Sequence, residues 1–197
     1  LNSYKPFACG IVIHPTIEGC MELREEIGPK VDRIASVELR THPLVLELTG
    51  KTEPKTGLEG KFSVYHAAAA ALLRADGSPT AFTDEAVNDS ALIALRRAVR
   101  AETDPACAED AVTIRVTLDD GRSFEKRIEH AIGSHDRPLT DAQLETKFLH
   151  QAALVIGQDA SRRLMATAWR LAELSDAGEV ARASVPQQPA RAAATAR

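Results

Sequence analysis

The chain has 197 residues, a formal net charge of -4, and an apolar content of 44% with few aromatic residues. This length fits one medium domain, or one small domain with an appendage, and the apolar content excludes a chain that is disordered throughout. The charge is mild and no long basic run is present, so nucleic acid is not an expected partner.

Cysteine usage and hydropathy exclude further classes of protein. Cys9, Cys20 and Cys107 do not have the spacing of a disulfide framework, a zinc ribbon or an iron–sulfur cluster, so we expect a reducing, cytoplasmic location and no metal. No stretch reaches the roughly 18–20 apolar residues of a membrane span, and we expect neither a membrane span nor a signal peptide. The chain begins at Leu1 rather than at methionine, and we interpret it as lacking an N-terminal portion.

The first third of the chain predicts a helix, a strand and a second helix. His14–Ile27 has an apolar stripe near helical spacing, with proline at its start and Gly-Pro at its end. Apolar and polar residues alternate over Ile34–Thr41, which predicts a half-buried strand. Lys51–Gly60 predicts an exposed loop, and Phe62–Leu73 predicts a helix whose alanine run lets another backbone approach closely.

The middle of the chain predicts two short helices and the remaining strands. The helices are expected over Thr83–Val87 and Ser90–Arg97, and a strand over Val99–Thr103. Alternation over Val112–Leu118 and Arg122–Ile128, joined by an Asp-Asp-Gly turn, predicts a β-hairpin. The expected fold class is therefore α+β, a small antiparallel sheet of three or four strands with helices packed on one face.

The pattern changes near Pro138. Thr140 and Gln143 have the spacing of a capping box, which predicts a helix to about Ala153, and a second helix is expected over Asp159–Leu174. We predict an α+β domain over residues 1–135, C-terminal helices that belong to an all-helical domain over residues 136–176, and a disordered tail over residues 177–197.

Three segments carry the candidate chemistry. In the first, Lys5 and His14 bracket the apolar run of KPFACGIVIHP, at a helix start whose N–H groups and dipole favour a carboxylate. In the second, EGKFSVYH, Lys61, Ser63 and His66 flank the first turn of the alanine-rich helix. The third, GSHDRPLT, precedes the C-terminal helices. A structural interpretation is open for each segment: solvated lysines, helix-terminal histidines, and a linker followed by a cap.

In this order the three segments resemble the C-terminal portion of the MmgE/PrpD family. Known members include 2-methylcitrate dehydratase, cis-aconitate decarboxylase and iminodisuccinate epimerase, which act on small di- or tricarboxylates without a metal or an organic cofactor. The resemblance implies a small α+β domain that closes over a cleft, followed by helices that return to an all-helical domain. The expected partners are a di- or tricarboxylate substrate, the N-terminal helical domain of the same protein, and a second copy in a homodimer.

The resemblance also implies roles for individual residues. Lys5 matches a lysine that binds or polarises a substrate carboxylate, and His66 falls where members place a tyrosine or histidine that faces the substrate. We therefore predict Lys5 and His66 as catalytic residues, with His66 as acid or base, and Lys5, Lys61, Ser63 and His14 as substrate contacts. Lysine and histidine suit proton transfer beside a carboxylate without a metal.

The reaction subtype remains open at this point. Decarboxylase-type members have a histidine five positions after the lysine, where this chain has Gly10. We expect a hydro-lyase of the 2-methylcitrate dehydratase type, with an epimerase or racemase, or a non-catalytic closing or dimerisation module, as alternatives. Without the helical domain, the C-terminal helices are expected to expose an apolar stripe of Leu144, Phe148, Leu164 and Leu171.

Overall fold

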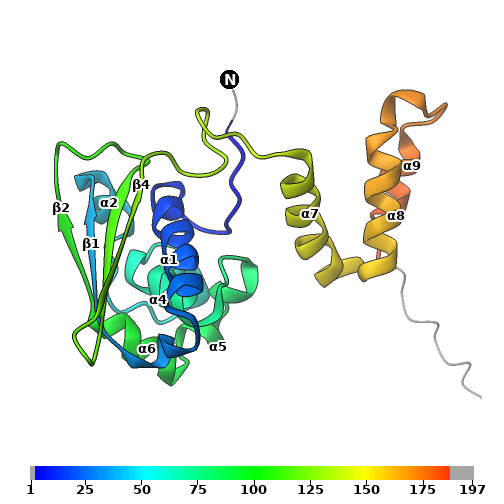
Figure 1. Cartoon of the computed structure of the whole chain (residues 1–197). Coiled ribbons are helices and arrows are strands. Elements are labelled where there is room, and N and C mark those ends of the chain that lie inside the picture. The colour runs from blue at the N-terminus through cyan, green and yellow to red at the C-terminus, as the bar shows by residue number, and fades with distance from the viewer. Residues whose placement is uncertain (1–2, 187–197) are drawn as a thin grey trace, which may run out of the picture. The chain divides into compact units, whose positions relative to one another are not determined.

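The structure is a computed structural model, and it describes residues 3–186 (Figure 1). The chain divides into two compact units, Leu1–Leu139 and Thr140–Arg197, which we call unit 1 and unit 2. Unit 1 contains a sheet and helices, unit 2 contains helices, and the predicted α+β fold class is confirmed. Among the described residues, no helix has the length and apolar content needed to cross a membrane.

The elements follow one another along each unit with short connections. Unit 1 contains η1 (Ile11–Ile13), α1 (His14–Ile27), η2 (Gly28–Arg33), β1 (Ile34–Thr41), α2 (Pro43–Thr49), α3 (Gly57–Gly60), α4 (Val64–Arg74), η3 (Pro79–Phe82), α5 (Asp84–Val87), α6 (Ser90–Ala98), β2 (Val99–Thr103), β3 (Val112–Leu118) and β4 (Ser123–Ile128). Unit 2 contains α7 (Asp141–Ile156), α8 (Gln158–Trp169), η4 (Leu171–Glu173) and α9 (Gly178–Ala183).

The four strands form one sheet in the order β2-β1-β3-β4. β3 pairs antiparallel with both β1 and β4, as expected, whereas β2 pairs parallel with β1, with Val37 opposite Val99. The sheet is therefore mixed, which corrects the expectation that all its strands are antiparallel. The reason is the long connection from β1 to β2, which includes α2 to α6 and returns the chain in its original direction.

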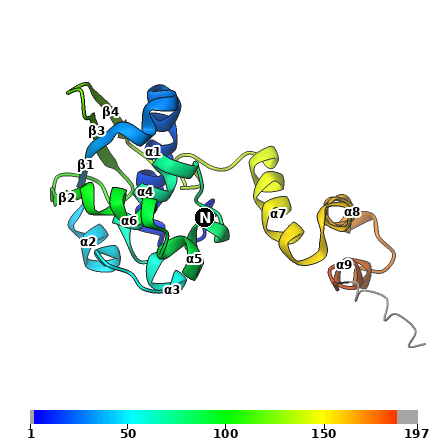
Figure 2. The ribbon, with the colours of Figure 1, turned by 90° about the horizontal axis from the view of Figure 1, so that it is seen from below.

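The core of unit 1 lies between the sheet and the helices on one of its faces (Figures 1 and 2). α1 packs on β3 and β4 and against α4, and α4 packs in turn against α6. Gly19 allows α1 to pack closely on β3, because a Cβ at residue 19 would lie 2.6 Å from Cδ1 of Ile114. The run Ala67–Ala71 of α4 is at most 1% exposed, in agreement with the close backbone approach predicted for it.

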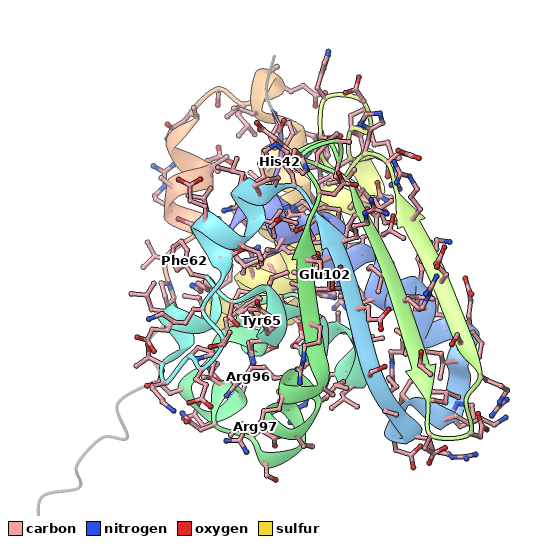
Figure 3. All side chains as sticks on the ribbon, turned by 90° about the vertical axis from the view of Figure 1, so that its left-hand side faces the viewer. His42, Phe62, Tyr65, Arg96, Arg97 and Glu102 are labelled. Carbon is pink, nitrogen blue, oxygen red and sulfur yellow. The ribbon has the colours of Figure 1, made fainter. Side chains whose placement is uncertain are left out.

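The other face of the sheet is polar and open (Figure 3). Glu38 and Arg40 of β1 and Arg115 of β3 are exposed there, and Nη2 of Arg115 lies 2.8 Å from Oε2 of Glu125 on β4. Apolar residues therefore face the helices and charged residues face away from them, as the alternating pattern predicts.

Unit 2 is built on the neighbouring helices α7 and α8, which pack against each other. The capping box is confirmed, since the Thr140 side chain accepts from N–H of Gln143 and the Gln143 side chain accepts from N–H of Thr140. α8 ends at Trp169 rather than near residue 174. α9 lies within the range predicted to be a disordered tail, and residues 187–197 of that range lie outside the described residues.

Three further details differ from the sequence predictions. α2 was not predicted, and α3 lies within the expected loop Lys51–Gly60. α4 begins at Val64, so Phe62 lies before the helix and is 48% exposed. The expected exposed stripe is correct for Leu171, which is 51% exposed, and wrong for Leu164, which is 7% exposed.

Candidate functional site

The segment that carries Lys5 is fixed to unit 1 by backbone hydrogen bonds on both sides of the lysine. N–H of Tyr4 donates to the carbonyl of Gly133, and N–H of Ala8 donates to the carbonyl of Gly77, each over 3.0 Å. Lys5 itself is exposed. Its position is thus set by the fold while its ammonium group is accessible to an anion.

A third backbone bond brings the second motif to the first. N–H of Gly10 donates to the carbonyl of Lys61 over 3.0 Å, and Lys61 is half-buried at the C-terminal end of α3. Both lysines act electrostatically on Cys9, which is 4% exposed: burial raises the pKa of its thiol to about 12, against the opposing effect of Lys5 and Lys61. The charges of both lysines thus act on one buried thiol, and we call Lys5, Cys9 and Lys61 the lysine pair site.

Ser63 is used by the fold as a helix cap. It is fully buried, and its Oγ accepts from N–H of His66 over 3.1 Å at the start of α4. This bond satisfies one of the free N–H groups of the first turn and fixes the backbone that follows Lys61. Ser63 thus caps α4 two residues after Lys61.

His66 lies inside unit 1 rather than on its surface. Its side chain is 0% exposed, Nε2 lies 2.8 Å from the carbonyl of Ala81, and its ring meets that of Phe82 edge-on at 5.9 Å. Because a carbonyl only accepts, Nε2 carries the proton and Nδ1 does not. Within the described part of the chain, Nδ1 is buried and has no hydrogen-bond partner.

The environment of His66 keeps its imidazole neutral. Burial lowers its pKa, the bond to Ala81 opposes this, and the positive charges of Arg96 and Arg74 lower the pKa further. Arg96 is itself 5% exposed, and its Nη1 donates to the carbonyl of Val87 over 3.1 Å. Phe62, Tyr65 and Arg96 lie beyond the β2 edge of the sheet (Figure 3).

His14 is the first residue of α1 and is 1% exposed. Its ring meets that of Phe7 edge-on at 5.4 Å. It also lines a cavity of about 290 Å³ together with Tyr4, Ile11 and Ile132. His14 is therefore a wall residue of this cavity and packs against Phe7 of the segment that carries Lys5.

The third motif, GSHDRPLT, contains the last loop of unit 1. Gly133 has a φ of +83°, and a Cβ there would lie 2.1 Å from the carbonyl oxygen of Tyr4, so no other residue fits. Nη2 of Arg137 lies 2.7 Å from Oε1 of Glu18, a buried residue of α1, and Oε2 of Glu18 accepts from N–H of Ile132. The motif thus anchors the last loop of unit 1 to α1 and to the Lys5 segment.

Sequence reasoning missed Cys9 and Arg96. Cys9 lies within the first motif, four residues after Lys5, and the only signal was that position. The burial of Arg96 depends on its hydrogen bond to Val87 at the end of α5, and the sequence around Arg96 does not predict that bond. Of the predicted residues, Lys5 is exposed and Lys61 half-buried, in segments that the bond from Gly10 to Lys61 joins, whereas Ser63 and His66 are buried.

The order and spacing of these anchored motifs can be compared with known proteins. The MmgE/PrpD C-terminal domain family matches residues 7–172 of this chain. The chain belongs to this family. It is also 25% identical to cis-aconitate decarboxylase of Mus musculus over 192 residues, which are 91% of this chain and 38% of that protein. This MmgE/PrpD chain thus spans about two-fifths of the length of the curated relative that it matches.

Gly10 of this MmgE/PrpD domain has little space for a side chain. A Cβ at this position would lie 2.9 Å from Cγ2 of Thr49 and 3.5 Å from the carbonyl oxygen of Lys61. Thr49 is held from the other side, because its Oγ1 donates to the carbonyl of Val45 over 2.5 Å. A larger side chain at Gly10 therefore requires Thr49 to move.

Proposed function

We propose that this chain is the C-terminal domain of a hydro-lyase of the 2-methylcitrate dehydratase type. The enzyme would act on a small di- or tricarboxylate and remove a proton from the carbon next to a carboxylate. The N-terminal helical domain of the same protein would supply the rest of the site, and the whole protein would be a homodimer. The family resemblance includes members that need neither a metal nor an organic cofactor, and the proposal follows them.

The observation that carries this proposal is the lysine pair site. Lys5 and Lys61 come from separate segments that one backbone bond, from Gly10 to Lys61, holds together. Two ammonium groups whose charges both act on the Cys9 thiol would attract a substrate with two or more carboxylates more strongly than a single lysine would. They would also stabilise the charge that develops when a proton leaves the carbon next to a bound carboxylate.

For His66 the predicted role as acid or base is untested, and its geometry supports a different one. A ring that is 0% exposed and bonded to Ala81 does not reach a substrate without a rearrangement of α4. We therefore propose His66 as a positioning residue: its backbone N–H donates to Ser63, close after Lys61, and its ring ties this start of α4 to Ala81. His14, as a cavity wall residue that packs against Phe7, would support the Lys5 segment in the same way.

Gly10 supports a dehydratase over a decarboxylase. In decarboxylase-type members the resemblance places a histidine at this position, and here the space for a side chain is taken up by Thr49. An epimerase or racemase is the second candidate, because it needs the same proton abstraction. A non-catalytic closing or dimerisation module is the third, and for it the lysine pair site would have no function.

The test is a screen of the whole protein that carries this domain. Citrate, 2-methylcitrate, cis-aconitate and iminodisuccinate are incubated in deuterated water and followed by NMR. Elimination of water from 2-methylcitrate or citrate is the expected result. Deuterium incorporation without elimination would support the epimerase instead, and the absence of both elimination and exchange on all four acids would leave only the non-catalytic module.

A further inference from the structure

Three side chains from separate segments of unit 1 meet at its surface, apart from the lysine pair site. They are Asp110 from the loop before β3, His130 from the residues after β4, and Asp136 from the loop that Gly133 closes. Nδ1 of His130 lies 3.0 Å from Oδ2 of Asp110 and 4.0 Å from Oδ2 of Asp136. One ligand atom from each of the three side chains lies within 4.8 Å of the other two, and we call Asp110, His130 and Asp136 the Asp-His-Asp group.

The backbone holds these three residues in place independently of their side chains. N–H of Ala131 donates to the carbonyl of Asp110 over 3.1 Å, and Nη1 of Arg137 donates to the carbonyl of His130 over 2.9 Å. N–H of Gly133 donates to the carbonyl of Arg137 over 2.7 Å, which closes the loop around Asp136. The side chains are thus brought together by the fold and not by their own attraction alone.

A cavity lies beside the group, on the side of its two carboxylates. The cavity of about 290 Å³ is lined by Asp110 and Asp136, and also by Glu109 and His135. None of the described residues that line it is a lysine or an arginine. The described wall of the cavity therefore has three carboxylates and no lysine or arginine, and it includes Asp110 and Asp136 of the Asp-His-Asp group but not His130. The cavity offers room for a cation together with water ligands.

We propose that the Asp-His-Asp group binds a divalent transition-metal ion such as Zn²⁺. One imidazole nitrogen and two carboxylate oxygens form a ligand set that suits Zn²⁺, and the two carboxylate charges balance the ion. Ligand atoms at about 2.0–2.2 Å from a tetrahedral Zn²⁺ lie roughly 3.3–3.5 Å apart, so the observed spacings require only small shifts of Asp110 and Asp136. Water from the cavity completes the coordination.

The bound ion would join the loop before β3 to the loop that ends unit 1. The loop that ends unit 1 is already anchored to α1 by Arg137 and to the Lys5 segment by Gly133. The inference is independent of the proposed function, because it uses none of the residues of the lysine pair site. A failure of either one leaves the other standing.

The test measures Zn²⁺ binding to the chelator-treated chain by equilibrium dialysis, with Co²⁺ as a visible-absorption probe of nitrogen and oxygen ligation. We expect saturable binding of one ion per chain. Asp136→Asn changes an exposed side chain, so it is expected to keep the fold, and it should weaken binding by about tenfold or more. His130→Ala should weaken it at least as much and abolish the Co²⁺ spectrum.

The matched control is His135→Ala, which removes a histidine from the loop of Asp136 and from the cavity wall but not from the group. It should leave the affinity for Zn²⁺ within about twofold of the unaltered chain, since it removes no proposed ligand. The proposal is overturned if the unaltered chain shows no saturable uptake. It is equally overturned if Asp136→Asn and His130→Ala, shown to be folded by circular dichroism, bind Zn²⁺ as tightly as His135→Ala.

Discussion

Unit 1 and unit 2 have equally clear amphipathic patterns, but they bury their apolar residues to different extents. In unit 1 the inward residues of β3 and the alanine run of α4 are at most 1% exposed. In unit 2, α7 is described over its full length and has no fully buried residue, and Leu154 and Val155 are 61% and 67% exposed. Leu164 and Ser161 are the buried residues of α8.

This difference shows that a periodic pattern predicts a helix but not what the helix packs against. The partner of α1 and α4 is the sheet of the same unit, and that contact closes a core. The helices of unit 2 pack on each other and leave much of their apolar surface uncovered, which fits the proposed return to a helical domain. Unit 1 is therefore expected to carry most of the stability of this chain.

The largest expected effect comes from the core of unit 1. Ile114→Ala, at a site that is 0% exposed on β3, should lower the free energy of unfolding of unit 1 by about 3–4 kcal/mol because it leaves a cavity. Leu154→Ala, at a site that is 61% exposed on α7, should change stability by less than about 0.5 kcal/mol. Urea denaturation followed by far-UV circular dichroism measures both. Equal losses would contradict the comparison of the two units.

A smaller effect is expected at the start of unit 2. Thr140→Ala removes the N-cap of α7 and should lower the stability of unit 2 by about 1 kcal/mol. Trp169 is the single tryptophan of the chain, and its Nε1 donates to Oε1 of Glu145 on α7 over 2.8 Å. Its fluorescence therefore follows unit 2 alone. The fluorescence midpoint should fall while the transition of unit 1 stays in place, and a joint shift would show that the units unfold together.

The smallest expected effect is a dependence on pH. Burial holds the pKa of His66 below its ordinary value of 6.5, so the neutral form is favoured in the folded state. Its contribution to stability is complete above pH 6.5 and is lost as the pH falls from there towards the folded-state pKa. His66→Gln keeps a donor for Ala81 but does not titrate. The difference in unfolding free energy between the two chains should therefore shrink as the pH falls below 6.5.

His130 provides a control of opposite sign. Its hydrogen bond to Asp110 raises its pKa above 6.5, so its contribution is complete below pH 6.5 and is lost as the pH rises through the folded-state pKa. The difference in unfolding free energy between His130→Gln and the unaltered chain should therefore become smaller as the pH rises. The account of His66 would be wrong if both substitutions gave slopes of the same sign.

Local signals account for the parts of the fold that the sequence predicts. The capping box of Thr140 and Gln143 and the Asp-Asp-Gly turn of the hairpin each act within a few residues, and both are found in the structure. α2 was missed because its N-cap is His42, whose Nδ1 accepts from N–H of Leu44, and histidine is not a usual cap. The direction of β2 was wrong because it depends on the whole crossover from β1.

The candidate site shows the same difference between local features, which the sequence predicts, and long-range features, which it does not. The motifs single out Lys5 and Lys61 in the sequence, but the joining of their segments depends on the bond from Gly10 to Lys61, between residues about fifty positions apart. The burial of His66 depends on Ala81 and on the ring of Phe82, which no local pattern links to it. Residue types could thus be predicted from the motifs, whereas exposure and proximity required the folded chain.

The central claim is that Lys5 and Lys61 hold the carboxylates of the substrate, and kcat/KM of the whole protein for its accepted acid tests it most directly. Lys5→Met and Lys61→Met should each lower kcat/KM by about 100-fold, the effect of removing one charge-assisted contact from the reacting group. Lys30→Met, at a half-buried lysine of η2, serves as the matched control and should leave it unchanged. Values for Lys5→Met and Lys61→Met equal to that control would contradict the account.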